Sequence, residues 1–252
     1  MIPQIHGLTR VAAALLKRLD TPALERLITG LAIERAATLP ADESLRFLFR
    51  MQAALYPILG KTAVRYGGGV HTKHRHTKYH DFFVRRIRAH ERVLDIGCGI
   101  GAVAFDIAER AGARVLGIDL VSGNIDAARR QHSHPRVEYR VQDGLASFGE
   151  QSFDVVVLSN ILEHLSSRPE FLRGVSARVR PSRFLIRIPL FERDWQVPLK
   201  RELGVEWRLD DTHETEYTLE SFDEEMRQAG CRITHQEVRW GEIWAEVTPD
   251  AA

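Results

Sequence analysis

The chain has 252 residues, 44% of them hydrophobic and 27% charged, with a formal net charge of +1. This composition is typical of a globular protein with one large core, and the near-zero charge argues against a general attraction to nucleic acid or anionic membranes. Two cysteines are too few for a disulfide framework, no apolar run is long enough to span a membrane, and charges interrupt the N-terminal apolar stretch, so we expect no signal peptide and a cytoplasmic setting.

Residues 1–60 are expected to form a helical N-terminal cap. Thr21 is expected to cap one helix with Pro22 in its first turn, and Asp42 to cap the next, which ends at Pro57. The latter helix is expected to turn four apolar residues inward: Leu45, Leu48, Phe49 and Leu55. A packed cap, a homodimer surface and a substrate lid all fit this pattern.

Residues 61–90 form a basic, histidine-rich stretch in which Asp81 is the single acid. Four histidines lie close enough in sequence to suggest a metal site (His71, His74, His76 and His80), but no cysteine or cluster of carboxylates accompanies them, so we expect no metal. The stretch is also short for a nucleic-acid arm. We favour a lid or linker that closes over a ligand pocket.

Three glycines at alternate positions follow a short apolar strand at residues 92–96: Gly97, Gly99 and Gly101. Glycine allows a sharp turn and a close approach of ligand to backbone, and the helix that follows presents free N–H groups. A dinucleotide site has the spacing G-x-G-x-x-G, whereas this turn has G-x-G-x-G with Asp95 two residues before it. Asp95 suits a ligand that presents an ammonium group or hydroxyls.

Each of the next three predicted strands is followed by a polar residue. Residues 113–119 end in Asp119, which is placed to accept ribose hydroxyls. Residues 136–141 precede Asp143, and the apolar run 153–159 precedes Asn160.

The remaining chain continues the α/β pattern. A helix from Pro169 precedes a strand at 184–188, and the acidic segment 190–218 is predicted to be an irregular insert before the next helix. Two antiparallel strands close the chain.

Asp95-Ile-Gly-Cys-Gly-Ile-Gly and the acids that follow it in order resemble the motifs of the class I S-adenosylmethionine-dependent methyltransferases. The resemblance implies an α/β, Rossmann-like seven-stranded sheet with helices on both faces and an antiparallel C-terminal hairpin, here within residues 91–252. It implies S-adenosylmethionine as cofactor, S-adenosylhomocysteine as product, and cofactor contacts from the following residues: Arg75, Tyr79, Asp95, Gly97, Cys98, Gly99, Gly101, Asp119, Leu120, Asp143, Gly144 and Asn160.

Methyl transfer to a hydroxyl also needs a base, and His164 and His213 are the candidates. The signature Asn-Pro-Pro-Tyr of amide and amine methylation is absent, since Ser159-Asn160-Ile161-Leu162 stands there. We therefore expect O-methylation of a small molecule in bacterial glycan, quinone or natural-product biosynthesis, with N- or C-methylation as alternatives. The basic stretch favours an anionic acceptor. A binding module of the same fold without turnover, and a nicotinamide-dependent enzyme, are the alternatives from other classes.

Overall fold

The computed structural model describes residues 16, 19–148 and 151–250. The chain divides into two compact units. One reaches Thr62 and includes Glu202–Val205, and the other comprises Ala63–Arg201 and the chain from Glu206 onward. None of the described helices combines the length and apolarity that crossing a bilayer requires.

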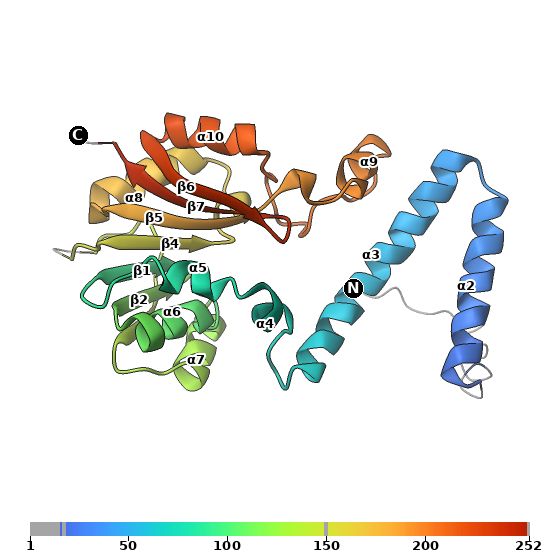
Figure 1. Cartoon of the computed structure of the whole chain (residues 1–252), viewed down its shortest axis with the longest axis horizontal. Coiled ribbons are helices and arrows are strands. Elements are labelled where there is room, and N and C mark those ends of the chain that lie inside the picture. Colours follow the sequence, from blue (N-terminus) through green and yellow to red (C-terminus); the bar gives the residue numbers. More distant parts are fainter. Residues whose placement is uncertain (1–15, 17–18, 149–150, 251–252) are drawn as a thin grey trace. The chain divides into compact units, whose positions relative to one another are not determined.

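The helical unit contains α2 (Thr21–Ala37) and most of α3 (Ala41–Tyr66), drawn in blue in Figure 1. Asp20, not Thr21, caps α2, because the Asp20 carboxylate accepts a hydrogen bond from the Ala23 N–H at 2.8 Å. The prediction that Pro57 ends the helix was wrong, since α3 continues through it to Tyr66. Asp42 lies in the first turn of α3, not before it. Residues 1–15, 17 and 18 of the predicted cap lie outside the described residues.

The expected inward stripe of α3 is only partly buried. Phe49 is buried, whereas Leu48 and Leu55 are 42% and 59% exposed. Phe49 is the single buried residue of α3, and α2 has none, so the described part of this unit has too few layers to enclose a core. The helices were predicted correctly, but the faces that they bury were not.

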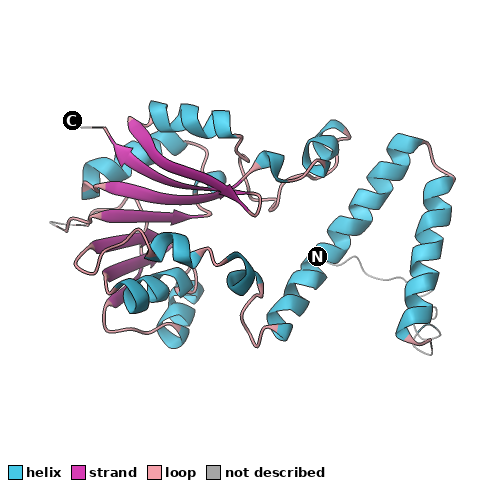
Figure 2. Ribbon diagram, viewed as in Figure 1, coloured by secondary structure: helices cyan, strands magenta, loops and turns pink. Residues whose placement is uncertain are grey.

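The larger unit is a seven-stranded sheet in the order β3-β2-β1-β4-β5-β7-β6. Five strands run parallel: β1 (Arg92–Ile96), β2 (Arg114–Asp119), β3 (Val137–Val141), β4 (Val155–Ser159) and β5 (Arg183–Pro189). The hairpin of β6 (Cys231–Arg239) and β7 (Glu242–Pro249) adds antiparallel to β5. The strands form one twisted layer with helices on both sides (Figure 2). This is the sheet that the resemblance implied.

Alternation along the strands divides the core into two layers. Leu94 and Leu116 point to the face covered by α8 (Arg168–Val179) and α10 (Leu219–Gln228). Val93 and Val115 point to the other face, covered by three helical segments: α5 (His80–Val84), α6 (Ala102–Asp106) with its π-helical continuation η1 (Ile107–Ala111), and α7 (Ser122–Gln131). Each fully buried aliphatic side chain contributes about 1.5–3 kcal/mol. Burial on both faces explains why β4 reads as an unbroken apolar run.

Helix caps follow the predictions in part. Thr218 caps α10, and Thr218 and Ser221 each bond the other's backbone N–H. Ser122 is the first residue of α7 and follows Val121. The insert between β5 and α10 is not wholly irregular, since it contains α9 (Gln196–Glu202).

Candidate functional site

The glycine turn after β1 depends on the absence of side chains. Gly97 and Gly101 have φ of 70° and 84°, a left-handed conformation that favours glycine. A Cβ on Gly97 would lie 2.0 Å from Cδ1 of Ile161, and one on Gly101 would lie 2.5 Å from the Tyr139 hydroxyl. A Cβ on Gly99 would meet nothing within 4 Å, so open space adjoins the middle of the turn.

Asp119 at the end of β2 holds this turn in place. One carboxylate oxygen accepts a hydrogen bond from the Gly99 N–H at 3.0 Å. The other accepts from the Val121 N–H at 2.8 Å and the Asn124 amide at 3.2 Å. Asp119 therefore fixes the glycine turn and the start of α7 together, with lone-pair capacity left for a ligand hydroxyl.

A pocket of about 520 Å³ opens at the carboxyl ends of the parallel strands, where open α/β sheets bind ligands. It brings together seven of the predicted site residues: Gly97, Asp119, Leu120, Asp143, Gly144, Asn160 and His164. Leu120 is 72% exposed at this pocket and offers it an apolar surface. Seven other lining residues were not among the predicted site residues: Ile96, Val121, Asn124, Gln142, Ile161, Leu165 and Phe171.

Two polar oxygens near this pocket are buried without a partner. Oδ2 of Asp95 and Oδ1 of Asn160 accept no hydrogen bond from the described residues. Burial, and secondly the negative charge of Asp119, raise the pKa of Asp95 to about 7. Asn160 is held in a left-handed conformation (φ 58°) while its N–H donates to the Arg187 carbonyl at 2.7 Å. Buried polar atoms without partners are rare in folded proteins.

Two further predicted site residues, Asp143 and Cys98, have different roles. Asp143 accepts a hydrogen bond from the Leu145 N–H at 2.8 Å, which forms a turn beside Gly144. Burial raises the pKa of the Cys98 thiol, so Cys98 stays protonated and serves as a small loop residue.

Three side chains of the basic stretch before β1 form a connected chain with Asp106 of α6. Asp106 bonds His80 at 2.7 Å, His80 bonds His74 at 3.2 Å, and His74 lies 3.3 Å from the Tyr79 hydroxyl. Burial raises the pKa of Tyr79 to about 12, with the charges of Asp95 and Asp106 contributing. Burial, and then the charge of His80, lower the pKa of His74 to about 4, so His74 is neutral at pH 7.

Arg75 does not line the same pocket as the residues that follow the strands. It lines a second cavity with His74 and Asp106 among others, and its guanidinium lies 5.5 Å from the Tyr66 ring centre. The Tyr79 ring instead packs under the Arg187 guanidinium at 3.9 Å.

Glu163, His164 and His213 converge beside the 520 Å³ pocket. Glu163 and His164 follow β4 in the 3-10 turn η2 (Leu162–His164), and His213 comes from the insert. One ligand atom from each lies within 4.8 Å of the others, and the two imidazole rings are 4.7 Å apart. His164 lines the pocket, whereas Glu163 and His213 are buried behind it. The two predicted bases thus lie together, and Glu163 is the member that sequence reasoning did not assign.

Neighbouring groups determine which nitrogen of each imidazole carries the proton. The Thr212 hydroxyl donates to Asp210 at 2.7 Å, so it accepts from Nδ1–H of His164 at 3.0 Å. Nδ1 of His213 lies 3.3 Å from Glu216, whose carboxylate accepts. Although burial raises the pKa of Glu216, hydrogen bonds from His213, Leu209 and Arg193 bring it below the usual value. In the neutral form of each ring, the Nε2 atom therefore carries the lone pair.

Burial raises the pKa of Glu163 to about 7. Neither of its carboxylate oxygens has a hydrogen-bond partner among the described residues. Desolvation, and then His213, lower the pKa of His164. The backbone ties the two segments together, since the Glu163 carbonyl accepts from the Glu214 N–H at 2.8 Å and the Thr215 N–H at 3.3 Å. Backbone hydrogen bonds therefore hold the cluster in place, while the Glu163 carboxylate has no hydrogen-bond partner among the described residues.

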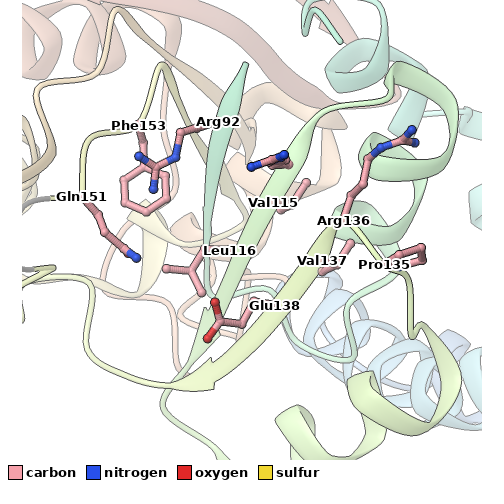
Figure 3. A pocket seen from close by; sticks show the side chains of 10 residues that line it. Arg92, Val115, Leu116, Pro135, Arg136, Val137, Glu138, Gln151 and Phe153 are labelled. Carbon is pink, nitrogen blue, oxygen red and sulfur yellow. The ribbon is translucent and has the colours of Figure 1, made fainter. Parts of the chain in front are cut away.

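A different cavity, of about 550 Å³, lies at the amino ends of β1–β3 (Figure 3). Its lining includes the charged residues Arg92, Arg136 and Glu138 together with Val115 and Leu116 of β2. The Arg92 backbone N–H is used by Asp154 at 2.7 Å, and its guanidinium lies 5.2 Å from the Phe153 ring centre. Parallel sheets bind ligands at the opposite edge, so this cavity is not the candidate site.

Comparison with known proteins agrees with the geometry. The family described as "Methyltransferase domain" matches residues 71–236. A ubiquinone biosynthesis O-methyltransferase of Rhodopseudomonas palustris (strain BisB5) is 29% identical over 153 residues, covering 58% of this chain and 60% of the relative. One of Methylocella silvestris is 42% identical over 93 residues, 36% of each chain. The chain therefore spans less than two thirds of the length of these relatives.

The fold also matches solved structures. Magnesium protoporphyrin IX methyltransferase from Synechocystis PCC 6803, with bound S-adenosylhomocysteine, superposes with a TM-score of 0.55 at 15% identity, covering 69% of this chain and 84% of that one. At this identity the likeness concerns the fold alone.

Proposed function

The chain belongs to the class I S-adenosylmethionine-dependent methyltransferase family, and from that membership we propose that it methylates a hydroxyl oxygen of a small molecule. The observation that carries the proposal is the single pocket edge that joins Asp119, Asp143 and Asn160 to His164. One end of that pocket suits a nucleoside and the other carries groups that can activate a hydroxyl.

The residues present fit S-adenosylmethionine. The Asp119 carboxylate retains lone pairs for ribose hydroxyls, and one oxygen of Asp143 is free of the turn for a base amino group. The unpartnered Oδ2 of Asp95 suits an ammonium group, and the space beside Gly99 admits a ligand close to the backbone. We assign these residues, with Gly97 and Leu120 as walls, to cofactor binding.

When bound, S-adenosylmethionine supplies a methyl group that is already activated on a sulfonium. The protein's contribution is then to position the acceptor, to exclude water and to remove the acceptor's proton. As the new O–C bond forms and the S–C bond breaks with its electron pair on sulfur, the hydroxyl proton must leave. We assign removal of this proton to the cluster of Glu163, His164 and His213, of which His164 lines the pocket.

Among acceptor classes we propose an aromatic hydroxyl such as that of a quinone precursor. The support is the activity for which the relatives are named, O-methylation in ubiquinone biosynthesis. The apolar lining from Ile161, Leu165 and Phe171 also suits a ring better than a sugar. Free thiols at Cys98 and Cys231 agree with a reducing compartment.

Two measurements test the proposal. Calorimetry with S-adenosylhomocysteine and with NADH should give binding of the former only, and binding of NADH alone would end the methyltransferase proposal. Release of S-adenosylhomocysteine from S-adenosylmethionine should then be followed over hydroxylated aromatics, sugars and amines. We expect turnover with a hydroxylated aromatic, and turnover with amines alone would reassign the chemistry to nitrogen.

A further inference from the structure

Three potential ligand atoms face one another at the acceptor side of the pocket. A carboxylate oxygen of Glu163 and one nitrogen each of His164 and His213 lie within 4.8 Å of one another. Atoms bound to one ion at about 2.1 Å lie about 3–4.2 Å apart, depending on the angle between them. The 4.8 Å limit on the present spacing lies just above that range.

The same atoms are not in direct contact. Hydrogen bonds in proteins span about 2.7–3.2 Å, yet both Glu163 oxygens lack any hydrogen-bond partner among the described residues. Glu163 is fully buried, and a buried carboxylate is costly unless it is paired or coordinates a metal. The three groups are therefore spaced more like the ligands of one ion than like hydrogen-bonded partners.

Both imidazoles are oriented as metal ligands usually are. A ligating histidine commonly donates its other N–H to a carboxylate or another oxygen, which fixes the tautomer and the ring orientation. Here Nδ1–H of His213 is directed to the Glu216 carboxylate, and Nδ1–H of His164 to the Thr212 hydroxyl. The Nε2 lone pairs of both rings are left for coordination.

We propose that Glu163, His164 and His213 bind a divalent first-row transition metal ion at the acceptor side of the pocket. Two imidazoles and one carboxylate form a donor set that suits such ions and leaves coordination positions open. Because His164 lines the pocket, those positions face the space in which an acceptor lies.

The role of the ion rests on the proposed function. A hydroxyl oxygen that coordinates a divalent cation loses its proton more readily, so the proton passes to solvent and the oxygen attacks as an anion. In this arrangement Glu163 and the histidines act as ligands, and Thr212 and Glu216 act as positioning residues. The ion takes the part that a free imidazole base would otherwise take.

The test is a titration of the chelator-treated protein with Co²⁺, followed by visible absorption and calorimetry, with Zn²⁺ as competitor. We expect one equivalent to bind, with the d–d bands of nitrogen and oxygen ligation. Glu163→Gln and His213→Ala should each weaken Co²⁺ binding at least about tenfold. Glu216→Gln changes the carboxylate that orients His213 and that Arg193 and Leu209 also bond, and it should weaken binding by about 10–100-fold. His90→Ala, at an exposed histidine outside the cluster, is the matched control and should bind as the wild type.

S-adenosylhomocysteine calorimetry on the same samples, together with their metal-free melting temperatures, separates the possible failures. Wild-type protein that binds the nucleoside but not Co²⁺ or Zn²⁺ would overturn the metal site and leave methyl transfer standing. Loss of nucleoside binding would instead remove the proposed function. Equal metal binding by the wild type and by two folded variants, Glu163→Gln and His213→Ala, would also overturn the assignment.

Discussion

The two halves of the site are built in different ways. On the cofactor side, Gly97, Asp119 and Asp143 each follow their own strand within a few residues. On the acceptor side, Glu163 and His164 follow β4, but His213 arrives from a long insert after β5. The first half therefore follows from the sheet itself, whereas the second needs the insert to fold back onto it.

This difference predicts a separation of roles. The cofactor side should govern affinity for the nucleoside, because its polar atoms line the pocket or hold the glycine turn. The acceptor side should govern turnover, because its groups lie where a hydroxyl must lose a proton. Variants in the two halves should therefore have different kinetic signatures.

The largest effect is expected at His213. His213→Ala should lower kcat by about 10²–10⁴-fold, the usual contribution of groups that assist proton removal, with affinity for S-adenosylhomocysteine changed less than about twofold. Steady-state kinetics and calorimetry on the same preparation measure both. A variant that lost affinity and turnover equally would erase the proposed division.

Gly101→Ala should destabilise the glycine turn on the cofactor side of the site. The new Cβ meets the buried Tyr139 ring and the residue keeps a positive φ, so we expect a loss of about 2–4 kcal/mol in the free energy of unfolding. Gly68→Ala is the control, because Gly68 also has positive φ (67°) but nothing lies within 4 Å of a Cβ there. Urea unfolding should give about 1 kcal/mol for that control, and equal losses would refute the steric argument.

Asp119→Ala should weaken nucleoside binding by about 1–3 kcal/mol, because ribose hydroxyls lose a charged acceptor and the Gly99 N–H loses its bond. Calorimetry with S-adenosylhomocysteine measures the change. The maximal rate with saturating cofactor should fall far less than in His213→Ala. Unchanged affinity would remove Asp119 from the binding site.

The pH dependence of binding should report Asp95. Its pKa of about 7 means that it holds a proton in the unliganded protein below that pH, and an ammonium ligand favours the ionised form. Binding then releases a proton, so affinity should fall by up to about tenfold per unit as pH drops below 7. In the free protein the same raised pKa makes Asp95 lower stability as pH rises from about 4 to 7. Asp95→Asn should flatten the affinity profile between pH 6 and 8, and a profile that stayed equally steep would point to another group.

The smallest effect is expected at Arg75. The resemblance suggested that it meets the cofactor carboxylate, but its guanidinium lies by Tyr66 and lines another cavity. Arg75→Ala should therefore change nucleoside affinity by less than about 0.5 kcal/mol, as exposed substitutions usually do. A tenfold loss in calorimetry would show that the basic stretch moves onto the cofactor when it binds.

The sequence was sufficient to predict the strands and the residues at their carboxyl ends. Short apolar runs and the alternating segment 136–141 predicted strands, and the family resemblance predicted the seven-stranded sheet that they form. The polar residues that end or follow the strands were expected to meet, because parallel strands bring their carboxyl ends to one edge. Asp143, Asn160 and His164 lie at that edge as expected.

It failed where packing decides. Nothing in the pattern around Pro57 indicates that α3 continues through it, and propensity at one residue is readily overridden by the rest of a long helix. Glu163 was not among the predicted site residues, since its burial beside His213 depends on backbone bonds between its own turn and the insert. Which histidine nitrogen is free depends in turn on Thr212 and Glu216, whose side chains reach them only in the folded insert.

The ends of the insert lie side by side. Leu190 and Tyr217 form a parallel bridge, and the Phe191 N–H donates to the Tyr217 carbonyl at 2.7 Å. A segment whose two ends meet can be exchanged as a cassette without moving the strands that flank it. Chimeras that keep His213 and Glu216 but differ elsewhere between residues 191 and 217 should accept other acceptor molecules while they keep the same nucleoside affinity, which makes this junction a natural place to change acceptor choice.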